Sequence, residues 1–391
     1  MVSCSPSIGY HVSMKILIVS PKFHPIIGGG ETFVLNSAQQ LHAAGHEVAL
    51  AVEPHPFRIK TDYPFPVFEI PGLSDARLDV LKAPNGLYKL LESYKPDVIH
   101  VHGYFSLLAV GLCNQNIPVI ASIHSTPVWG QRIIGGMDGF DQELVFAEQI
   151  LRFTMPRIVT GANNVYTDVA QKLVPKTVMV NQFPYPILEE FYEMHERSTY
   201  RTMFGLNDSD VLVTVPSRII ERKGIREAVV AISTLPDNFY LCLPAATNPL
   251  DMAYWHSIQE SDSYIRTKDR MIIPKVEILH DQMPSLYAAS DLVIMPSYYE
   301  GAPVATVEAM ASHRPFIGAD SQGINGFIKN MENGILVPPK SSIELADAIL
   351  TLSNNFDLQQ KFTTQAARDV AHLSWEIQLP KLIDLYQRCV E

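Results

Sequence analysis

Short apolar runs rich in Val and Ile alternate along this chain with longer stretches of helical periodicity. In the first half, such runs predict strands at 16–20, 48–52, 98–101, 119–123, 158–160 and 178–180. Between them, apolar residues spaced three and four apart predict helices at 32–44, 84–94, 105–115, 141–153 and 163–173. Strands that alternate with helices are typical of βαβ units, so the pattern indicates a parallel sheet.

A proline-punctuated segment at 181–187 interrupts this pattern, which then begins again. The second series predicts strands near 211–216, 239–243, 271–273, 276–279, 291–295, 315–318 and 335–337. Its predicted helices cover 223–233, 283–289, 303–311, 342–353 and 357–371, and a last helix runs from about 375 to 390. We therefore predict an α/β protein with two Rossmann-like, doubly wound domains that face one another across a cleft. The expected parts are a loose extension at 1–13, domains at 14–186 and 187–372, and a C-terminal segment at 373–391.

Composition and charge exclude several classes of partner. The 391 residues are 47% hydrophobic and carry a formal net charge of −11, which argues against nucleic acid as a partner. Residues 1–190 hold 13 basic and 16 acidic side chains, so they form no polybasic surface for anionic lipid. No apolar run reaches the roughly 18 residues that span a bilayer. The four cysteines have no paired spacing and are predicted to be free thiols in a reducing, cytoplasmic compartment.

Two carboxylates eight positions apart, Glu300 and Glu308, are the leading candidates for ligand contacts. They follow the predicted strand at 291–295, with a Gly301-Ala302-Pro303 turn between them, and Glu308 falls inside a predicted helix. A helix that begins after a strand end presents backbone N–H groups to an anion. A carboxylate there can accept hydrogen bonds from sugar hydroxyls. The alternative is a solvated acidic loop beside a surface glutamate.

Two further strand-to-helix turns carry candidate phosphate ligands. Gly28, Gly29 and Gly30 precede the predicted helix at 32–44, where glycine permits positive φ and close approach of a ligand. They do not match a dinucleotide or P-loop fingerprint, and a flexible loop without ligand contacts is the alternative. Arg218 and Lys223 flank the turn after the strand at 211–216, where two cations can neutralise a diphosphate. For this segment a solvated basic helix start is the alternative, and Glu221 and Arg222 are assigned no chemistry.

Three histidines fall at predicted strand ends. His100 and His102 alternate on one strand and therefore point the same way, while His124 ends a neighbouring strand. A metal site would need further ligands that the sequence does not offer, so no metal is predicted. The histidines are then either packing residues or residues that line the cleft, and for His124 the position favours the cleft.

In their order along the chain, these motifs resemble those of glycosyltransferase family 4, the retaining group with the GT-B fold. The resemblance runs from Met14 to the last helix and is carried by 28–31, 96–102, 218–224, 287–297, 300–311 and 333–338. It implies a C-terminal domain that binds a nucleotide-sugar, an N-terminal domain that binds the acceptor, and a final helix that crosses back to the N-terminal domain.

The resemblance also implies residue roles, with Arg218, Lys223, Glu300 and His124 as catalytic residues. Arg218 and Lys223 would hold the diphosphate, Glu308 the ribose, and Glu300 with the backbone of Gly301, Ala302, Pro303 and Val304 the donor hexose. His124 would contact the hexose from the other domain, and Gly29 and Gly30 would approach the phosphates. Such enzymes act without a divalent cation or other cofactor, and the leaving diphosphate takes the acceptor proton, so Glu300 is not assigned as a nucleophile.

The resemblance implies transfer of a hexose or N-acetylhexosamine from a UDP- or GDP-sugar to a hydroxyl acceptor. The lack of a basic surface in residues 1–190 favours a small soluble acceptor, a secondary metabolite or saccharide precursor, and a lipid-linked acceptor is the alternative. His102, Tyr104 and Trp129 are the candidate acceptor-binding residues, and the aromatic faces of Tyr104 and Trp129 can stack on a sugar or cyclitol ring. The alternative is that these aromatic residues belong to the core. Two alternatives stay open, an epimerase acting on UDP-N-acetylglucosamine and a non-catalytic protein that binds nucleotide-sugars. The second is motivated by Pro303 and Ser217, which stand where the family commonly has glycine.

Overall fold

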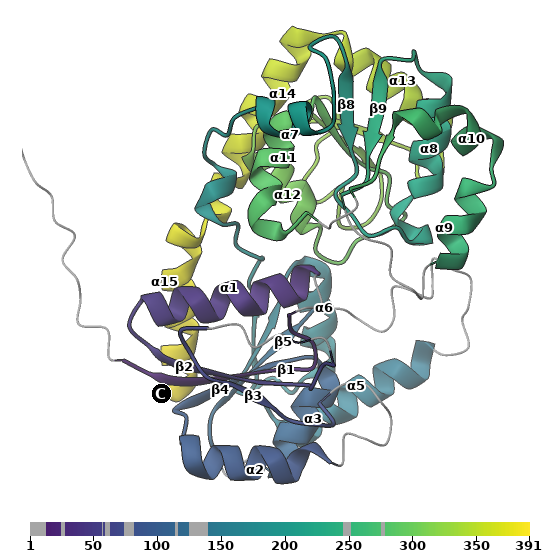
Figure 1. The fold of residues 1–391 in the computed structure, drawn as a ribbon. Helices are drawn as coiled ribbons and strands as arrows, with labels where there is room; N and C mark the ends of the chain where they lie inside the picture. The colour runs from purple at the N-terminus through teal and green to yellow at the C-terminus, as the bar shows by residue number, and fades with distance from the viewer. Residues whose placement is uncertain are drawn as a thin grey trace, which may run out of the picture. The chain divides into compact units, whose positions relative to one another are not determined.

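The computed structural model describes residues 13–24, 28–56, 58, 63–73, 82–113, 116–124, 140–244, 252–274 and 278–391. The chain divides into two compact units, of which unit 1 comprises Met1–Pro184 and Leu379–Glu391 and unit 2 comprises Tyr185–Gln378. Each unit contains one parallel sheet with helices packed on it (Figure 1), which confirms the predicted class of two Rossmann-like α/β domains.

Unit 1 holds a seven-stranded parallel sheet in the order β3-β2-β1-β4-β5-β6-β7. The strands are β1 (Lys15–Ser20), β2 (Glu47–Val52), β3 (Val67–Glu69), β4 (Val98–His102), β5 (Val119–Ile123), β6 (Ile158–Gly161) and β7 (Met179–Gln182). The helices are α1 (Gly29–Ala43), α2 (Ala83–Tyr94), α3 (Tyr104–Cys113), α5 (Phe140–Thr154) and α6 (Asn164–Leu173). Helix α1 covers one face of the sheet and α2 and α3 the other (Figure 1), which is why both faces of the central strands are apolar.

Unit 2 holds a six-stranded parallel sheet in the order β10-β9-β8-β11-β12-β13. The strands are β8 (Val211–Thr214), β9 (Phe239–Cys242), β10 (Met271–Ile272), β11 (Leu292–Met295), β12 (Phe316–Ala319) and β13 (Ile335–Val337). The helices are α7 (Ser198–Met203), α8 (Ile225–Thr234), α9 (Met252–Gln259), α10 (Asp262–Thr267), α11 (Met283–Ala289), α12 (Val304–Ala311), α13 (Ser342–Ser353) and α14 (Phe356–Val370). One core packs α8 and α13 on the sheet, and a second core packs α11 and α12.

The strand predicted at 276–279 is wrong for its described part. Ile278 and Leu279 belong to no strand, and Leu279 directly precedes the short 3-10 helix η6 (His280–Gln282); the rest of that prediction lies outside the described residues. Local apolar residues can predict a strand, but a strand forms only where a neighbouring strand is available to pair with it. The structure also adds β3, α7, α9 and α10, which were not predicted.

The last helix, α15 (Trp375–Val390), belongs to both units, because the division falls between Gln378 and Leu379. Its first turn is held in unit 2, where the Trp375 amide donates to the Ile187 carbonyl over 3.1 Å and the Glu376 amide to Glu189 Oε1 over 2.8 Å. The Glu189 carboxylate thus accepts a hydrogen bond from an otherwise free backbone N–H in the first turn of α15.

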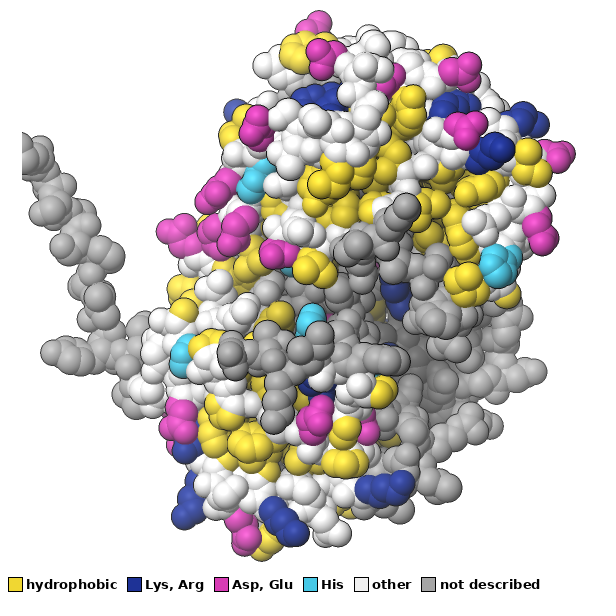
Figure 2. Space-filling model, in the orientation of Figure 1, with side chains coloured by type: hydrophobic (Ala, Val, Ile, Leu, Met, Phe, Trp, Pro, Cys, Tyr) yellow, Lys and Arg dark blue, Asp and Glu magenta, His cyan; other side chains and the backbone are white. Residues whose placement is uncertain are grey.

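The surface gives two further observations. On the face shown in Figure 2, basic and acidic side chains are interspersed, and the described side chains form no continuous basic patch there. Among the helices in the described part of the chain, none combines the length and apolar character needed to cross a membrane.

Candidate active site

The candidate site lies in unit 2, at the carboxyl ends of β8 and β11, which pair directly in the sheet. The turn after β8 leads through the 3-10 helix η3 (Glu221–Lys223) into α8, and Gly224 joins the two with φ +68°. A Cβ atom on Gly224 would lie 2.2 Å from the Pro296 carbonyl oxygen. Only glycine therefore lets the two turns approach closely enough to bring η3 next to the segment that follows β11.

This approach brings three charged side chains together. Lys223 Nζ donates to Glu300 Oε1 over 2.6 Å, and Arg222 donates to Glu300 Oε2 over 3.4 Å and to the Tyr299 carbonyl over 3.3 Å. The Arg222 guanidinium also lies over the Tyr299 ring, 5.3 Å from its centroid. Arg222 is thus part of the site, a role that its sequence context did not predict.

Burial and charge together set the protonation of this pair. Burial alone would raise the pKa of Glu300, but Lys223 and Arg222 outweigh it and hold that pKa below its usual value. Burial lowers the pKa of Lys223, and the Glu300 carboxylate opposes this shift. Glu300 is therefore an anion whose two oxygens both face cations, which makes it a fixed hydrogen-bond acceptor.

The backbone of Glu300 is fixed from the loop after β12. The Glu300 amide donates to the Gln322 carbonyl over 2.9 Å. Gly323 follows with φ +90°, and a Cβ atom there would lie 2.3 Å from the Glu300 carbonyl oxygen. A second glycine is thus required for a close approach of backbone to backbone, and it holds the carboxylate of Glu300 in place.

Arg218 extends the positive charge of the site toward solvent. It is exposed and makes no ion pair with any residue that the structure describes. Its charge contributes to lowering the pKa of Lys223, so the two cations are near enough to interact. Together with Arg222, they leave the cluster around Glu300 with an excess of positive charge, which suits an anionic ligand.

Glu308 lies in α12 and is held by two neighbours from earlier in the chain, neither of which was predicted from the sequence. His280 Nε2 lies 2.7 Å from Glu308 Oε1, and the Tyr287 hydroxyl donates to Oε2 over 3.2 Å. Glu308 is 4% exposed and Tyr287 is fully buried. Each carboxylate oxygen has a protein partner and retains a further lone pair for a ligand hydroxyl.

The turn between the two glutamates differs from the prediction in one respect. Pro303 was placed at the first helical position, but α12 begins at Val304 and Pro303 precedes it as the N-cap residue. The Val304 amide donates to the Ala302 carbonyl over 2.9 Å, and Pro303 has no amide hydrogen. Of the predicted backbone hydrogen bonds to a ligand, Pro303 can therefore donate none, and in this conformation the Val304 amide is already bonded within the turn.

In unit 1 the three predicted histidines do meet at the carboxyl edge of the sheet. The rings of His100 and His102 lie 4.3 Å apart between centroids, and those of His102 and His124 lie edge to edge in parallel planes, 4.8 Å apart between centroids. His102 Nδ1 lies within hydrogen-bond distance of His124 Nε2, at 2.5 Å. Phe33 from α1 contacts His102 and His124 edge-on. The predicted common direction of His100 and His102 is confirmed.

His100 is a structural residue. Its Nδ1 lies 2.7 Å from the Tyr386 hydroxyl of α15, and its Nε2 lies 2.7 Å from Ser122 Oγ, which in turn bonds Thr160. Burial lowers the pKa of His100 to about 3 and that of His124 to about 4, so both rings are neutral at pH 7. Among the described residues, no three ligand-type side chains are placed to hold a metal ion.

The remaining predicted residues of unit 1 have mixed outcomes. Gly29 and Gly30 form the first turn of α1, and Gly28 is extended with φ −171°, so the glycine run does not use positive φ. His102 is 1% exposed, and its Nε2 has no hydrogen-bond partner among the described residues. Tyr104 begins α3 and packs against the core, and Trp129 lies outside the described residues.

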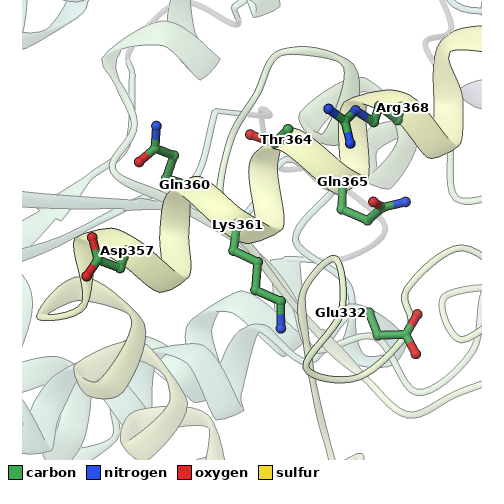
Figure 3. A pocket seen from close by; sticks show the side chains of 7 residues that line it. All are labelled: Glu332, Asp357, Gln360, Lys361, Thr364, Gln365 and Arg368. Carbon is green, nitrogen blue, oxygen red and sulfur yellow. The ribbon is translucent and has the colours of Figure 1, made fainter.

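A separate groove of about 610 Å³ is lined by side chains of α14 and by Glu332 of a neighbouring loop (Figure 3). Its lining is polar and of mixed charge and comprises Glu332, Asp357, Gln360, Lys361, Thr364, Gln365 and Arg368. Lys361 donates to the Met331 carbonyl and Gln365 to Asp369, so these two groups already have protein partners. None of the predicted site residues lies in this groove.

Comparison with known proteins agrees with this division of the chain. A family model described as Glycosyl transferases group 1 matches residues 196–369, and one described as Glycosyltransferase Family 4 matches residues 27–180. The chain belongs to glycosyltransferase family 4. The first of these models spans Arg218, Lys223, Glu300 and Glu308, so this family 4 glycosyltransferase has its charged cluster in the group 1 region.

Two relatives match this glycosyltransferase over most of its length. An uncharacterized glycosyltransferase of Methanocaldococcus jannaschii is 23% identical and covers 97% of this chain and 99% of its own. The N-acetyl-alpha-D-glucosaminyl L-malate synthase of Bacillus anthracis is 20% identical and covers 89% of this chain and 90% of its own.

Solved structures share the fold of this glycosyltransferase. Sucrose-phosphate synthase of Thermosynechococcus elongatus has a TM-score of 0.81 at 19% identity and covers 96% of this chain and 98% of its own. The Anabaena protein HepE, solved in complex with UDP and glucose, has a TM-score of 0.78 at 18% identity. The match covers 95% of this chain and 99% of the HepE chain. At these identities the likeness shows the fold alone.

Proposed function

We propose that this family 4 glycosyltransferase transfers a hexose or N-acetylhexosamine from a UDP- or GDP-sugar to a hydroxyl of a small soluble acceptor, with retention of configuration and without a metal ion. The observation that carries the proposal is the contact of Lys223 and Arg222 with the buried Glu300 carboxylate, at the same strand ends as Arg218. A site with excess positive charge and a fixed acceptor suits a ligand that is a phosphate at one end and a sugar at the other.

The roles divide according to charge. Arg218 and Lys223 hold the diphosphate, whose charge grows as the bond to the sugar breaks, and one such stabilising group contributes roughly 10²- to 10³-fold in rate. Glu308 accepts hydrogen bonds from the ribose hydroxyls, for which each of its oxygens retains a lone pair. Glu300 accepts hydrogen bonds from hydroxyls of the donor sugar.

The reaction proposed is a displacement on one face of the sugar. The acceptor oxygen forms the new bond to the anomeric carbon as the bond to the diphosphate oxygen breaks, and the leaving diphosphate takes the acceptor proton. Glu300 is a poor candidate for a nucleophile, because both of its oxygens face cations. The cationic side chains supply the charge that the leaving group requires, and the proposal therefore includes no metal ion.

Two relatives support the ligand classes. The structure of HepE was solved with UDP and glucose. The name of the Bacillus anthracis relative describes a product in which an N-acetylglucosaminyl group is joined to L-malate, a small soluble acid. The first supports a UDP-sugar donor, and the second supports a small acceptor. His124 contacting the donor hexose, and His102 and Tyr104 contacting the acceptor, remain predictions of the proposal.

Calorimetric titration with UDP and with GDP, followed by transfer assays with the corresponding sugars, tests the function. We expect binding of one nucleotide, transfer to an acceptor, and weaker nucleotide binding by about tenfold or more in Glu308→Ala, since a hydrogen-bond acceptor for two hydroxyls is lost. Glu332→Ala, an exposed carboxylate of the α14 groove, is the matched control and should bind as wild type does. Conversion of the donor into another nucleotide-sugar in the absence of acceptor, or binding with neither transfer nor donor hydrolysis, would contradict the proposal.

A further inference from the structure

His280 is a candidate for a role in the nucleotide site that the sequence motifs do not contain. It begins η6, directly before α11, and its imidazole reaches across to α12, 28 positions further along the chain. The Nε2–Oε1 distance of 2.7 Å is that of a strong hydrogen bond, with side-chain exposures of 25% for His280 and 6% for Glu308. The ring is therefore partly open to solvent while its partner is not.

Charged and polar groups surround His280 on the elements packed against it. Glu308 of α12 and Tyr287 of α11 lie on one side, and Asp281 of its own element and Glu190 of η2 (Glu189–Phe191) add negative charge. The Phe191 ring packs on the imidazole with centroids 5.3 Å apart. Burial alone would lower the pKa of His280, but the three carboxylates outweigh it and raise that pKa above its usual value.

We propose that His280 is a positioning residue of the nucleotide site, which holds the Glu308 carboxylate toward the ribose and, when protonated, cancels its charge. The inference rests on the proposed function, because it assumes that Glu308 contacts the nucleotide. Tyr287 fixes one oxygen and His280 the other, so the carboxylate plane has two anchors and cannot rotate away from a ligand.

The charge on His280 matters because the ligand is an anion. With His280 protonated, the pair with Glu308 has no net charge. With His280 neutral, the buried carboxylate keeps its negative charge and repels the diphosphate. Nucleotide binding then raises the pKa of His280 further, and by linkage the affinity falls as pH rises through that pKa.

Calorimetry with UDP, or with GDP if that is the nucleotide bound, tests the inference between pH 6.5 and 8.5. For the wild type we expect affinity to fall by roughly threefold to tenfold over this range beyond the change caused by the nucleotide's own titration. His280→Gln retains an amide donor for Glu308 but no titratable charge, so it should bind about as tightly as wild type at pH 8.5 and lose this extra slope. His280→Ala should bind more weakly than His280→Gln at both pH values.

The control is His256→Gln, which replaces an exposed histidine of α9 in the same unit and should keep the wild-type slope. The thermal unfolding midpoints of all three variants show whether a loss of nucleotide binding comes from a loss of folding. If His280→Gln keeps the wild-type slope, or His280→Ala binds as wild type does, the positioning role is wrong while the proposed function stands. If wild type binds neither UDP nor GDP, the proposed function itself fails.

Discussion

Lys223 and Glu300 are 77 positions apart in the sequence, yet their side chains share a hydrogen bond of 2.6 Å at the ends of two adjacent strands. The lysine is 13% exposed and the glutamate 6%. Removing one partner of a buried pair leaves the other charge without compensation, which typically costs about 3–5 kcal/mol. The pair therefore links the stability of unit 2 to its chemistry.

Lys223→Met should lower turnover by about 10²-fold or more and also lower the free energy of unfolding of unit 2. The double variant Lys223→Met with Glu300→Gln should recover much of that stability, because no buried charge is left unpaired, but none of the turnover. Steady-state assays and urea unfolding measure the two quantities. A double variant that regains turnover would show that the lysine charge is not required for catalysis.

Arg222→Ala should reduce turnover by about tenfold, a smaller effect than that of Lys223 because the Arg222 bond to Glu300 is longer and its side chain is more exposed. Arg226→Ala is the matched control, since Arg226 also lies over a tyrosine ring, that of Tyr254, but donates to Ser257 and not to Glu300. Equal losses in the two variants would indicate that stacking on tyrosine, and not the contact with Glu300, matters.

Gly323→Ala should displace the Glu300 backbone and lower turnover, because an added Cβ would collide with the Glu300 carbonyl and the residue holds positive φ. We expect destabilisation of at least about 1–2 kcal/mol. Gly326→Ala provides the comparison within the same loop, where the nearest atom to an added Cβ is 3.5 Å away. Comparable stability and turnover in the two variants would contradict the requirement for glycine at 323.

The stability of unit 1 should fall as pH decreases from about 6.5 toward 4. His100 and His124 have folded-state pKa values of about 3 and about 4, below the usual 6.5, so the unfolded chain binds more protons throughout this range. The stabilisation is complete above pH 6.5 and is lost on acidification. Urea midpoints at several pH values measure the slope, and His100→Gln should reduce it while the exposed His256→Gln should not.

The main sheets could be predicted from sequence because their strands are continuous apolar runs bounded by polar turns. The helices at 283–289 and 342–353 were predicted with the bounds that the structure has. The six-residue helices α7 and α10 were missed, since they are too short to establish a period. The strand predicted at 276–279 failed in its described part, Ile278 and Leu279, because pairing depends on neighbours and not on local alternation.

The same limit applies to the site. Strand-to-helix turns mark Arg218, Lys223, Glu300 and Glu308 as candidates from local pattern alone. The contacts of Arg222 with Glu300 and of His280 with Glu308 join distant segments, and their partners follow only from the order of strands and the glycines that let turns approach. For His280, its place directly before the helix at 283–289 was the available signal, since loop residues at such ends often carry function.

The bond between His100 and Tyr386 spans 286 positions of sequence. During synthesis the seven strands of unit 1 leave the ribosome long before the helix that carries Tyr386, and until then His100 has no hydroxyl partner on one nitrogen. The first unit to be translated is thus the last to be completed, and a nascent chain arrested within unit 2 should expose its unfinished core to chaperones and proteases.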